Sequence, residues 1–167
     1  MMENNIKDIE EGFKLVSNQS EAQKDCPITY IYTFDEIKEQ CGAIFVCVPT
    51  PPDKEGDCDA SILISALEKL RGYTGIVIAK STATPSIYND IETKFKDLKF
   101  AHVPEFLTAA NAIRDYQYPV QIVIGCRQEL RQDAFTTIVV DGIYFDFTKV
   151  KFCSIAEAAN AFISVAR

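Results

Sequence analysis

Three polar side chains follow apolar runs of this sequence, close to the points where the runs end: Thr50, Thr82 and Glu105. If those runs are parallel strands, their carboxyl ends lie at one edge of a sheet, where α/β proteins bind their ligands. Two hydroxyls and a carboxylate can line a small polar cleft there, and Lys80 is expected to pair with a nearby acid. By themselves these groups indicate a polar cleft and no particular reaction.

Each of these residues also has a purely structural explanation. Thr50 precedes two prolines, so the segment from Thr50 to Pro52 can be kept as a rigid turn out of a strand. Thr82 can cap a helix that begins at Pro85. Glu105 can be a buried carboxylate whose hydrogen bonds are satisfied within the fold. The sequence leaves these alternatives open.

Other residues with reactive side chains are expected to have structural roles. His102, the only histidine, lies inside an apolar run without an evident Ser or Cys nucleophile as partner, so a structural role is expected. Asp57 and Asp59 are expected to form a solvated turn, because their spacing is not that of a calcium loop. Six cysteines without close paired spacing predict free, buried thiols and no metal site. They are Cys26, Cys41, Cys47, Cys58, Cys126 and Cys153.

The composition argues against several classes of partner. With 17 Lys and Arg against 24 Asp and Glu, the net charge is −7 and no basic face is visible. Nucleic acid and anionic membranes are therefore not expected to bind. The chain does not begin with a positive segment followed by an apolar stretch, and no apolar run approaches the length of a membrane span. A cytoplasmic protein is the expectation.

The elements that would position the polar residues alternate between strands and helices. Apolar, β-branched runs separated by segments of helical period are typical of βαβ units with a mostly parallel sheet. The predicted fold class is therefore α/β, a Rossmann-like three-layer domain. Near-continuous apolarity at 43–48 and 75–79 predicts central strands covered on both faces. The predicted strands are 28–32, 43–48, 75–79, 99–103, 121–125 and 143–147.

The predicted helices carry apolar stripes that would cover the sheet. In the segment 61–70, apolar residues recur at helical spacing and form a packing face. Pro85 suits the first turn of a helix, where a missing N–H costs nothing. Ser154 is available as an N-cap for the last helix. The predicted helices are 35–40, 61–70, one that opens at Pro85, 109–118, 128–135 and 154–165.

Three segments carry a resemblance to a known family, in the same order and at similar spacing. The first combines FVCVPTPPD at 45–53 with the acidic turn GDCD at 56–59. The second is VIAKST at 77–82, and the third joins PEFL at 104–107 to the later strand IVIG at 122–125. A shorter fourth match is AANAF at 158–162. Together they make the chain resemble the UDP-glucose/GDP-mannose 6-dehydrogenase family from residue 9 to residue 167.

The resemblance implies an activity and roles for particular residues. Members of this family use NAD to oxidise the C6 alcohol of a sugar nucleotide to a carboxylate. By resemblance, Thr82 and Glu105 match positions that orient the catalytic water and the sugar, and Asn160 matches an amide donor. The implied cofactor contacts are Val48, Thr50, Pro51, Ser81 and Thr82, and the implied substrate contacts are Glu105, Phe106, Leu107 and Asn160.

The sequence also departs from the family's pattern. The family's fold begins with a strand, a glycine-rich phosphate-binding turn and a second strand, whereas residues from Ile9 onward already resemble the segment beyond them. The chain is therefore expected to lack the first βαβ unit and to bind no NAD. Ala156 stands where the family has a Lys that stabilises oxyanion charge, Val103 where it has Asn, and Ala109 where it has a carboxylate. The family's nucleophilic cysteine would lie beyond Arg167.

We therefore interpret residues 1–167 as one truncated domain that ends in the family's interdomain helix at about 154–167. The first hypothesis is a pseudoenzyme, inactive alone, that binds a protein partner, a nucleotide or a sugar nucleotide. The alternative is one part of a split or heteromeric NAD-dependent sugar-nucleotide dehydrogenase, and the third is a folded remnant without function. Residues 28–32 are expected to cover the exposed edge of 43–48. The last helix is expected to form a homodimer.

Overall fold

The computed structural model describes residues 33–140 and 149–165, which belong to one compact unit, Thr33–Arg167. A five-stranded sheet in the order β1-β2-β3-β4-β5 forms its centre. Neighbouring strands run parallel except β3 and β4, so the expectation of a mostly parallel α/β sheet is confirmed. The strands are β1 (Ala43–Val46), β2 (Ile76–Ala79), β3 (Lys99–His102), β4 (Ile122–Cys126) and β5 (Val150–Cys153).

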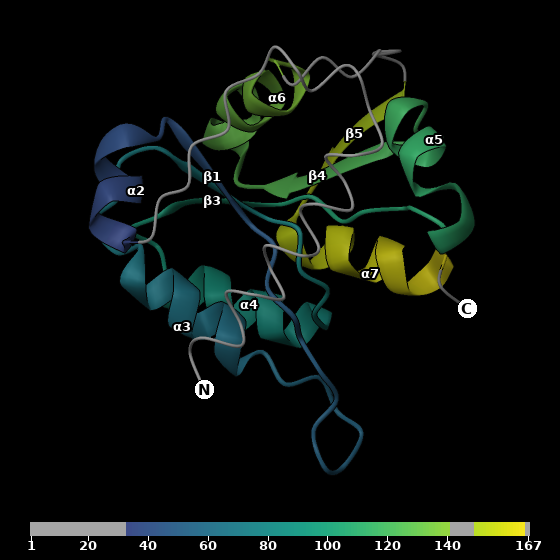
Figure 1. Ribbon diagram of the computed structural model, residues 1–167, viewed down its shortest axis with the longest axis horizontal. Coiled ribbons are helices and arrows are strands. Elements are labelled where there is room, and N and C mark those ends of the chain that lie inside the picture. Colours follow the sequence, from purple (N-terminus) through teal and green to yellow (C-terminus); the bar gives the residue numbers. More distant parts are fainter. Residues whose placement is uncertain (1–32, 141–148, 166–167) are drawn as a thin grey trace. The chain divides into compact units, whose positions relative to one another are not determined.

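Helices cover both faces of the sheet. Figure 1 shows α3, α4 and α7 along one face and α6 on the other. Alternate residues of β2 enter two separate cores: Val77 packs with the first group of helices, and Ile78 packs with α6. All four residues of β2 are buried, as expected for a central strand. The helices are α2 (Phe34–Gln40), α3 (Ser61–Lys69), α4 (Pro85–Lys94), α5 (Ala112–Gln117), α6 (Arg131–Val140) and α7 (Ile155–Val165), with 3₁₀ turns at Ala109–Asn111 and Gln128–Leu130. None of the described helices is long and apolar enough to cross a membrane.

The predicted cap residue is correct for α7 and wrong for α4. Ser154 and Glu157 form a reciprocal capping box at α7, because each side chain bonds the other residue's backbone N–H. Pro85 begins α4 as expected, but its N-cap is Thr84, whose hydroxyl accepts from the N–H of Ile87 at 3.4 Å. The structural explanation of Thr82 as the cap of this helix is therefore wrong.

The two outer strands differ from the predictions. β1 was expected to be covered on both faces, but it is the edge of the described sheet and Phe45 is 41% exposed. At the other edge, β5 begins at Val150, after the predicted strand at 143–147. The predicted strands at 28–32 and 143–147, and the predicted pairing of 28–32 with β1, lie outside the described residues. β5 is only four residues long, so the alternation of Val150, Lys151 and Phe152 is too short to predict a strand.

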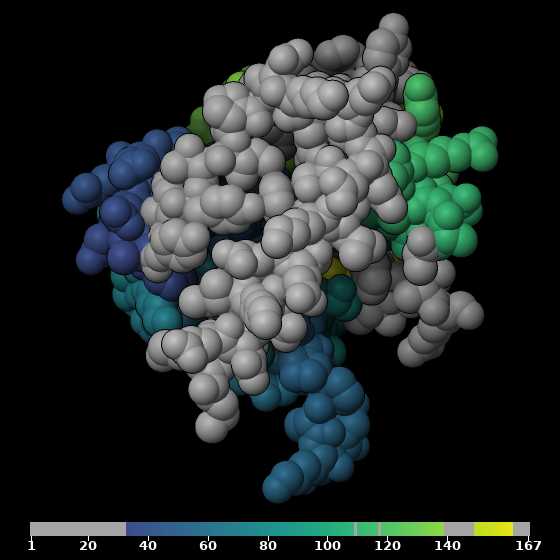
Figure 2. Space-filling model, in the orientation of Figure 1, coloured from purple at the N-terminus to yellow at the C-terminus, as the bar shows by residue number. Residues whose placement is uncertain are grey.

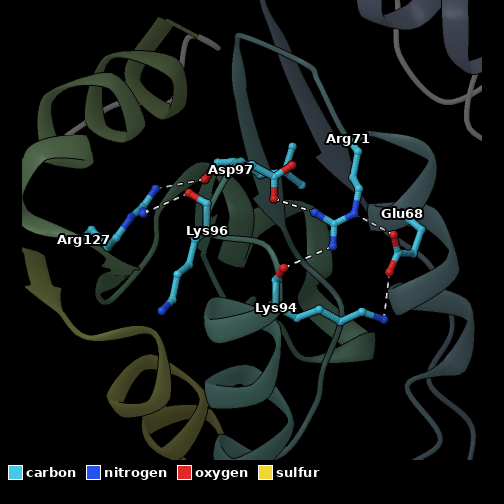
Figure 3. Close-up of polar contacts among 7 residues, drawn as sticks. Glu68, Arg71, Lys94, Lys96, Asp97 and Arg127 are labelled. Carbon is cyan, nitrogen blue, oxygen red and sulfur yellow. Dashed lines mark hydrogen bonds and ion pairs between the residues drawn. The ribbon is translucent and has the colours of Figure 1, made fainter.

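A network of charges ties the elements together at the amino ends of β2 and β3. Figure 3 shows Arg71 between the carboxylates of Glu68 (2.7 Å) and Asp97 (2.6 Å), while its third nitrogen donates to the carbonyl of Lys94. Arg127 donates to backbone carbonyls of the same turn, the segment between α4 and β3. This turn is therefore held by Arg71, which follows α3, and by Arg127, which follows β4.

The loop between β1 and α3 projects away from the sheet (Figures 1 and 2). It is internally bonded: the Asp53 side chain accepts from the N–H groups of Glu55 and Asp57, and Gly56 adopts φ +89° at the tip. Asp57 is exposed, and the carboxylate of Asp59 accepts from the N–H of Ser61. Asp57 is therefore in an exposed turn as expected, whereas Asp59 is half-buried.

Candidate functional site

An open cleft of about 440 Å³ lies at the carboxyl ends of β1, β2 and β3. The three strands end side by side there because β1 pairs with β2 and β2 pairs with β3 in parallel. This is the edge at which ligands bind in open α/β sheets. The residues that line the cleft are Cys47, Val48, Pro49, Thr50, Lys80, Ser81, Thr82 and Glu105.

Two of the cleft's three hydroxyls form hydrogen bonds with the backbone. The Ser81 hydroxyl accepts from the N–H of Val48 at 2.9 Å and donates to its carbonyl at 2.7 Å, which extends the β1–β2 pairing beyond the strands. The Thr50 hydroxyl donates to the carbonyl of Thr82 at 2.5 Å. The exposed Thr82 side chain is therefore the hydroxyl best placed to meet a ligand.

Lys80 and Glu105, which both line this cleft, form an ion pair. Lys80 follows β2, and its backbone N–H donates to the carbonyl of Val46 at 2.9 Å, so its stem is fixed to the sheet. Glu105 follows β3 after Pro104. The Lys80 and Glu105 side chains are 18% and 33% exposed. The expectation that Lys80 pairs with a nearby acid is confirmed.

A second, smaller hollow of about 50 Å³ is also lined by the residues of this ion pair. Lys80 and Glu105 are the two residues that line both hollows. The second hollow is mainly apolar and also contains Asp115, which accepts from the backbone N–H and the hydroxyl of Thr108. These hydrogen bonds hold the pKa of Asp115 below its usual value. Its other walls are Val103, Pro104, Phe106, Leu107, Tyr116, Pro119, Val120, Gln121, Ile122 and Ile138.

The prediction for Cys47, which lines the cleft, is wrong. A buried thiol inside a strand was expected, but β1 ends at Val46 and the Cys47 side chain is exposed at the cleft. Partial burial raises the pKa of its thiol, Lys80 lowers it and Glu105 raises it. Cys126, by contrast, is buried as expected. All the cysteines that the structure describes are free thiols.

His102 is a core residue, as its apolar surroundings predicted. It is 1% exposed, its Nδ1 lies 3.0 Å from the carbonyl of Ala79, and its ring stacks on Tyr88 at a centroid distance of 4.0 Å. Burial lowers its pKa to about 4, against a smaller rise from the Ala79 hydrogen bond. The imidazole is therefore neutral at physiological pH and lines neither hollow.

The predicted site residues fall into three groups. Val48, Thr50, Ser81, Thr82 and Glu105 come together at the large cleft. Phe106 and Leu107 line the smaller hollow, beside Glu105. Pro51 and Asn160 line neither, although Asn160 is exposed on α7. No role in the site was predicted for the segment 119–122, which lines the smaller hollow, because nothing in the sequence showed that β4 runs antiparallel to β3.

The described cleft lacks the glycines that a dinucleotide-binding site requires. A diphosphate cradle requires glycines that let the backbone approach the phosphates, and none of the residues lining the described cleft is glycine. The close approaches of glycine occur elsewhere: Gly125 lies under α7, and Gly75 lies near Tyr73. No group of three His, Cys, Asp or Glu side chains that could hold a metal occurs in residues 33–140 and 149–165.

The amino-acid sequence is similar to proteins of one family. Residues 1–147 match the NAD binding domain of the UDP-glucose/GDP-mannose dehydrogenase family. A UDP-glucose 6-dehydrogenase of Rickettsia bellii is 31% identical over 112 residues, which are 63% of this chain and 26% of that protein. The GDP-mannose 6-dehydrogenase of Pseudomonas aeruginosa is 30% identical over 99 residues, which are 48% of this chain and 22% of that protein.

Solved structures show the same fold. GDP-mannose dehydrogenase from Pseudomonas aeruginosa, in a ternary complex, superposes with a TM-score of 0.67 at 23% identity, over 80% of this chain and 33% of that one. UDP-glucose dehydrogenase from the archaeon Pyrobaculum islandicum gives a TM-score of 0.63 at 24% identity, with the same coverage. The chain thus spans a third or less of the length of these relatives.

Proposed function

This chain belongs to the UDP-glucose/GDP-mannose dehydrogenase family. We propose that it is a binding module that is not catalytically competent alone. Its ligand is a nucleotide or a sugar nucleotide, held in the cleft at the ends of β1, β2 and β3. Thr82 and the Lys80–Glu105 pair are the polar groups of the described cleft that face this ligand. NAD belongs to the family, and we propose that this chain alone does not hold it.

The lining of the described cleft is the observation that carries this proposal. A dinucleotide needs glycines that let the backbone approach its diphosphate, and none of the residues that line this cleft is glycine. Hydride transfer cannot proceed without that bound cofactor. The Lys80–Glu105 pair and Thr82 remain able to make hydrogen bonds to a bound ligand.

Residue 156 supports the same conclusion. By resemblance, the family carries there a Lys that stabilises oxyanion charge, and this chain has Ala156, half-buried on α7. The Asn160 amide is exposed on the same helix, but an amide donor does not replace a cation. A small apolar side chain thus stands where the family's Lys would be, which supports the proposal.

Two measurements on the purified chain test the proposal. Calorimetric titration with UDP-glucose, UDP-glucuronate and NAD should give saturable binding of a sugar nucleotide and none of NAD. Absorbance at the NADH band should stay flat when UDP-glucose and NAD are both added. NADH formation would show that the chain is an enzyme. Absence of binding for every nucleotide would leave a protein as the ligand.

The alternative is a part of a heteromeric sugar-nucleotide dehydrogenase, completed by another polypeptide. It is favoured by the clustering of Thr82 and Glu105 at one cleft and by relatives at least three times as long as the matched region. Protein purified under native conditions from its own cells would then reduce NAD with UDP-glucose. The same preparation with Glu105→Gln would lose that activity, and the chain purified alone would have none.

We also propose a homodimer formed through the last helix, although less of the apolar side of this helix is exposed than expected. Its first turns are already covered within the chain, because Ile155, Ala158 and Ala159 are buried against the sheet and α4. Light scattering at high concentration tests the association. A monomer would count against a dimer and leave a different protein as the proposed partner.

A further inference from the structure

The connection between β3 and β4 carries a group of exposed apolar side chains. Figures 1 and 2 show this segment, with α5 in green, at one side of the molecule. The exposed fractions run from 39% for Leu107 to 88% for Val120. We call these residues the α5 patch: Leu107, Ile113, Tyr116, Tyr118 and Val120.

The α5 patch is contiguous and large for a single domain. Leu107, Tyr116 and Val120 line the same smaller hollow. Ile113 and Tyr116 stand three residues apart on α5 and so share one face of the helix. From the exposed fractions, the five side chains present roughly 500 Å² of apolar surface, a size at which such patches are often functional.

Hydrogen bonds hold the patch in one conformation. The carboxylate of Asp115 accepts from the backbone N–H of Thr108 at 2.9 Å and from its hydroxyl at 2.7 Å. The segment before α5 is thereby fixed to the helix. At the other end of α5, the N–H of Tyr118 donates to the carbonyl of Arg114 at 2.8 Å. A preformed surface loses less conformational entropy on association than a flexible one.

The charge of the patch favours a second copy of this chain as its occupant. The chain has a net charge of −7, so two copies repel each other where their acidic surfaces meet. Residues 106–121 contain one cation, Arg114, and one carboxylate, Asp115, so this segment has no net charge. The acidic loop at 53–59 lies away from α5 (Figure 1). Two copies can therefore approach through this surface with little repulsion.

The patch also contains both parts of a self-complementary contact. The smaller hollow has a volume of about 50 Å³ and a mainly apolar lining. This is room for about four water-sized groups, which fits the branched tip of a Val. Val120 lines this hollow and is itself the most exposed residue of the patch. In a two-fold dimer one surface meets itself, so the projecting side chain of each copy can face the hollow of the other.

We propose that this chain forms a two-fold dimer through the α5 patch, in which Val120 of each copy enters the smaller hollow of the other. Tyr116 and Tyr118 supply aromatic contact area, which is enriched in protein interfaces. The inference goes beyond the proposed function, and the contact is separate from the one proposed for the last helix. Since about 60% of an interface is apolar, roughly 500 Å² of apolar surface corresponds to about 800 Å² per partner, the size of a standard interface.

Sedimentation equilibrium of the full chain, over a range of micromolar concentrations, tests the association. The wild type should form dimers. Val120→Asp should raise the dissociation constant about tenfold or more, because it brings a carboxylate toward Glu105 and Asp115, which line the hollow. Val120→Ile keeps a branched apolar tip and should still dimerise. Both variants should keep the wild-type circular dichroism spectrum, because the side chain at 120 is exposed.

A matched variant and hydrogen exchange locate the contact. Ile62→Asp adds the same charge at another exposed apolar residue, on α3, and should leave the dissociation constant unchanged. The amides of residues 112–120 should become more protected from exchange as the protein concentration rises. This protection should be absent in Val120→Asp at the same concentrations.

The outcomes separate this inference from the binding function. A dimer that is weakened by Val120→Asp and retained in Ile62→Asp supports the α5 contact. A wild type that stays monomeric at the highest concentration overturns it and leaves nucleotide binding in place. Equal weakening by the two Asp variants assigns the effect to net charge and also overturns it. A dimer unchanged in Val120→Asp, with protection confined to the last helix, overturns it in favour of that helix.

Discussion

The side chain of Ser81 bonds both backbone groups of Val48, accepting from its N–H at 2.9 Å and donating to its carbonyl at 2.7 Å. Ser81 thus takes the place that a further residue pair would occupy if β1 and β2 continued. Through this contact, the turn that carries Thr50 is fixed to the turn that carries Thr82. The hydroxyl is therefore a structural support for the cleft.

Ser81→Ala should destabilise the protein and loosen the cleft. The substitution leaves the N–H and carbonyl of Val48 without their partner, and an unsatisfied buried group costs about 1–3 kcal/mol. Urea unfolding should show this loss of stability. Ser86→Ala, on an exposed position of α4, is the control and should cost much less. Equal effects of the two substitutions would contradict the role of Ser81.

Gly125→Ala should be strongly destabilising because α7 lies directly on this residue. A Cβ at Gly125 would lie 2.6 Å from the Cβ of Ala158 and 2.8 Å from the Cα of Ile155. Backbone atoms cannot yield as a flexible side chain does, so overpacking of about 1–3 kcal/mol or more is expected. Gly42→Ala, where a Cβ meets nothing within 4 Å, is the matched control. A melting temperature equal to that of the control would refute this packing.

The single histidine should make stability depend on pH between pH 6.5 and pH 4. Burial first, and Lys80 to a smaller extent, lower the pKa of His102 from 6.5 to about 4 in the folded state. The unfolded chain therefore takes up a proton before the folded chain does. Stability is fully present above pH 6.5 and is lost as the pH falls toward 4, by about 3 kcal/mol in total.

Denaturant unfolding at pH 7 and pH 5 measures this dependence. His102→Gln should remove the slope in this window, even if it lowers stability at both pH values. No other histidine in the chain can produce it. An unchanged slope in the variant would assign the effect to another group.

The carboxylate of Glu68 should contribute to stability only above acidic pH. A hydrogen bond from Lys94, and then one from Arg71, lower its pKa below the ordinary 4.5. Stability from this group is present above pH 4.5 and is lost as the pH falls through the lower folded-state pKa. The melting temperature of Glu68→Gln should fall less than that of the wild type between pH 6 and pH 3. Glu55→Gln should behave as the wild type, and added salt should reduce the difference.

The thiol of Cys47 should respond to the charges of the cleft. Glu105 raises its pKa and Lys80 lowers it, beside the larger rise caused by burial. Glu105→Gln should therefore increase the thiolate fraction and speed alkylation at pH 8, and Lys80→Met should slow it. Mass spectrometry of the peptide that contains Cys47 reports this site alone. If both variants altered the rate in the same direction, the thiol would not be facing the pair.

Much of the fold was predictable because periodicity and turn chemistry are local properties. The strands at 76–79 and 99–102 and the helix that opens at Pro85 follow from runs of apolar residues and from the fixed φ of proline. β5 was missed because it is an edge strand of four residues, in which the alternation of Val150, Lys151 and Phe152 is too short to detect. Its existence depends on pairing with β4, which is a non-local property.

The site was predictable where residues end parallel strands. Thr50, Thr82 and Glu105 meet at one cleft because β1, β2 and β3 run in the same direction. The commitment of the Ser81 and Thr50 hydroxyls to the backbone could not be predicted, since each bond crosses more than 30 residues of sequence. The exposure of Cys47 depended on where β1 ends, and strand boundaries are the least certain feature of a sequence pattern.

The cleft and the charged contacts lie at opposite ends of the strands, and the reversed direction of β4 contributes to both. Because β4 runs against β3, its end brings Arg127 to the charged network, and the residues before its start close the smaller hollow. The connection between β3 and β4 spans the binding edge only, and no part of the Arg71 network lies on it. Changes of length or composition within 107–121 would therefore alter the walls of the smaller hollow and leave the contacts of Arg71 and Arg127 in place.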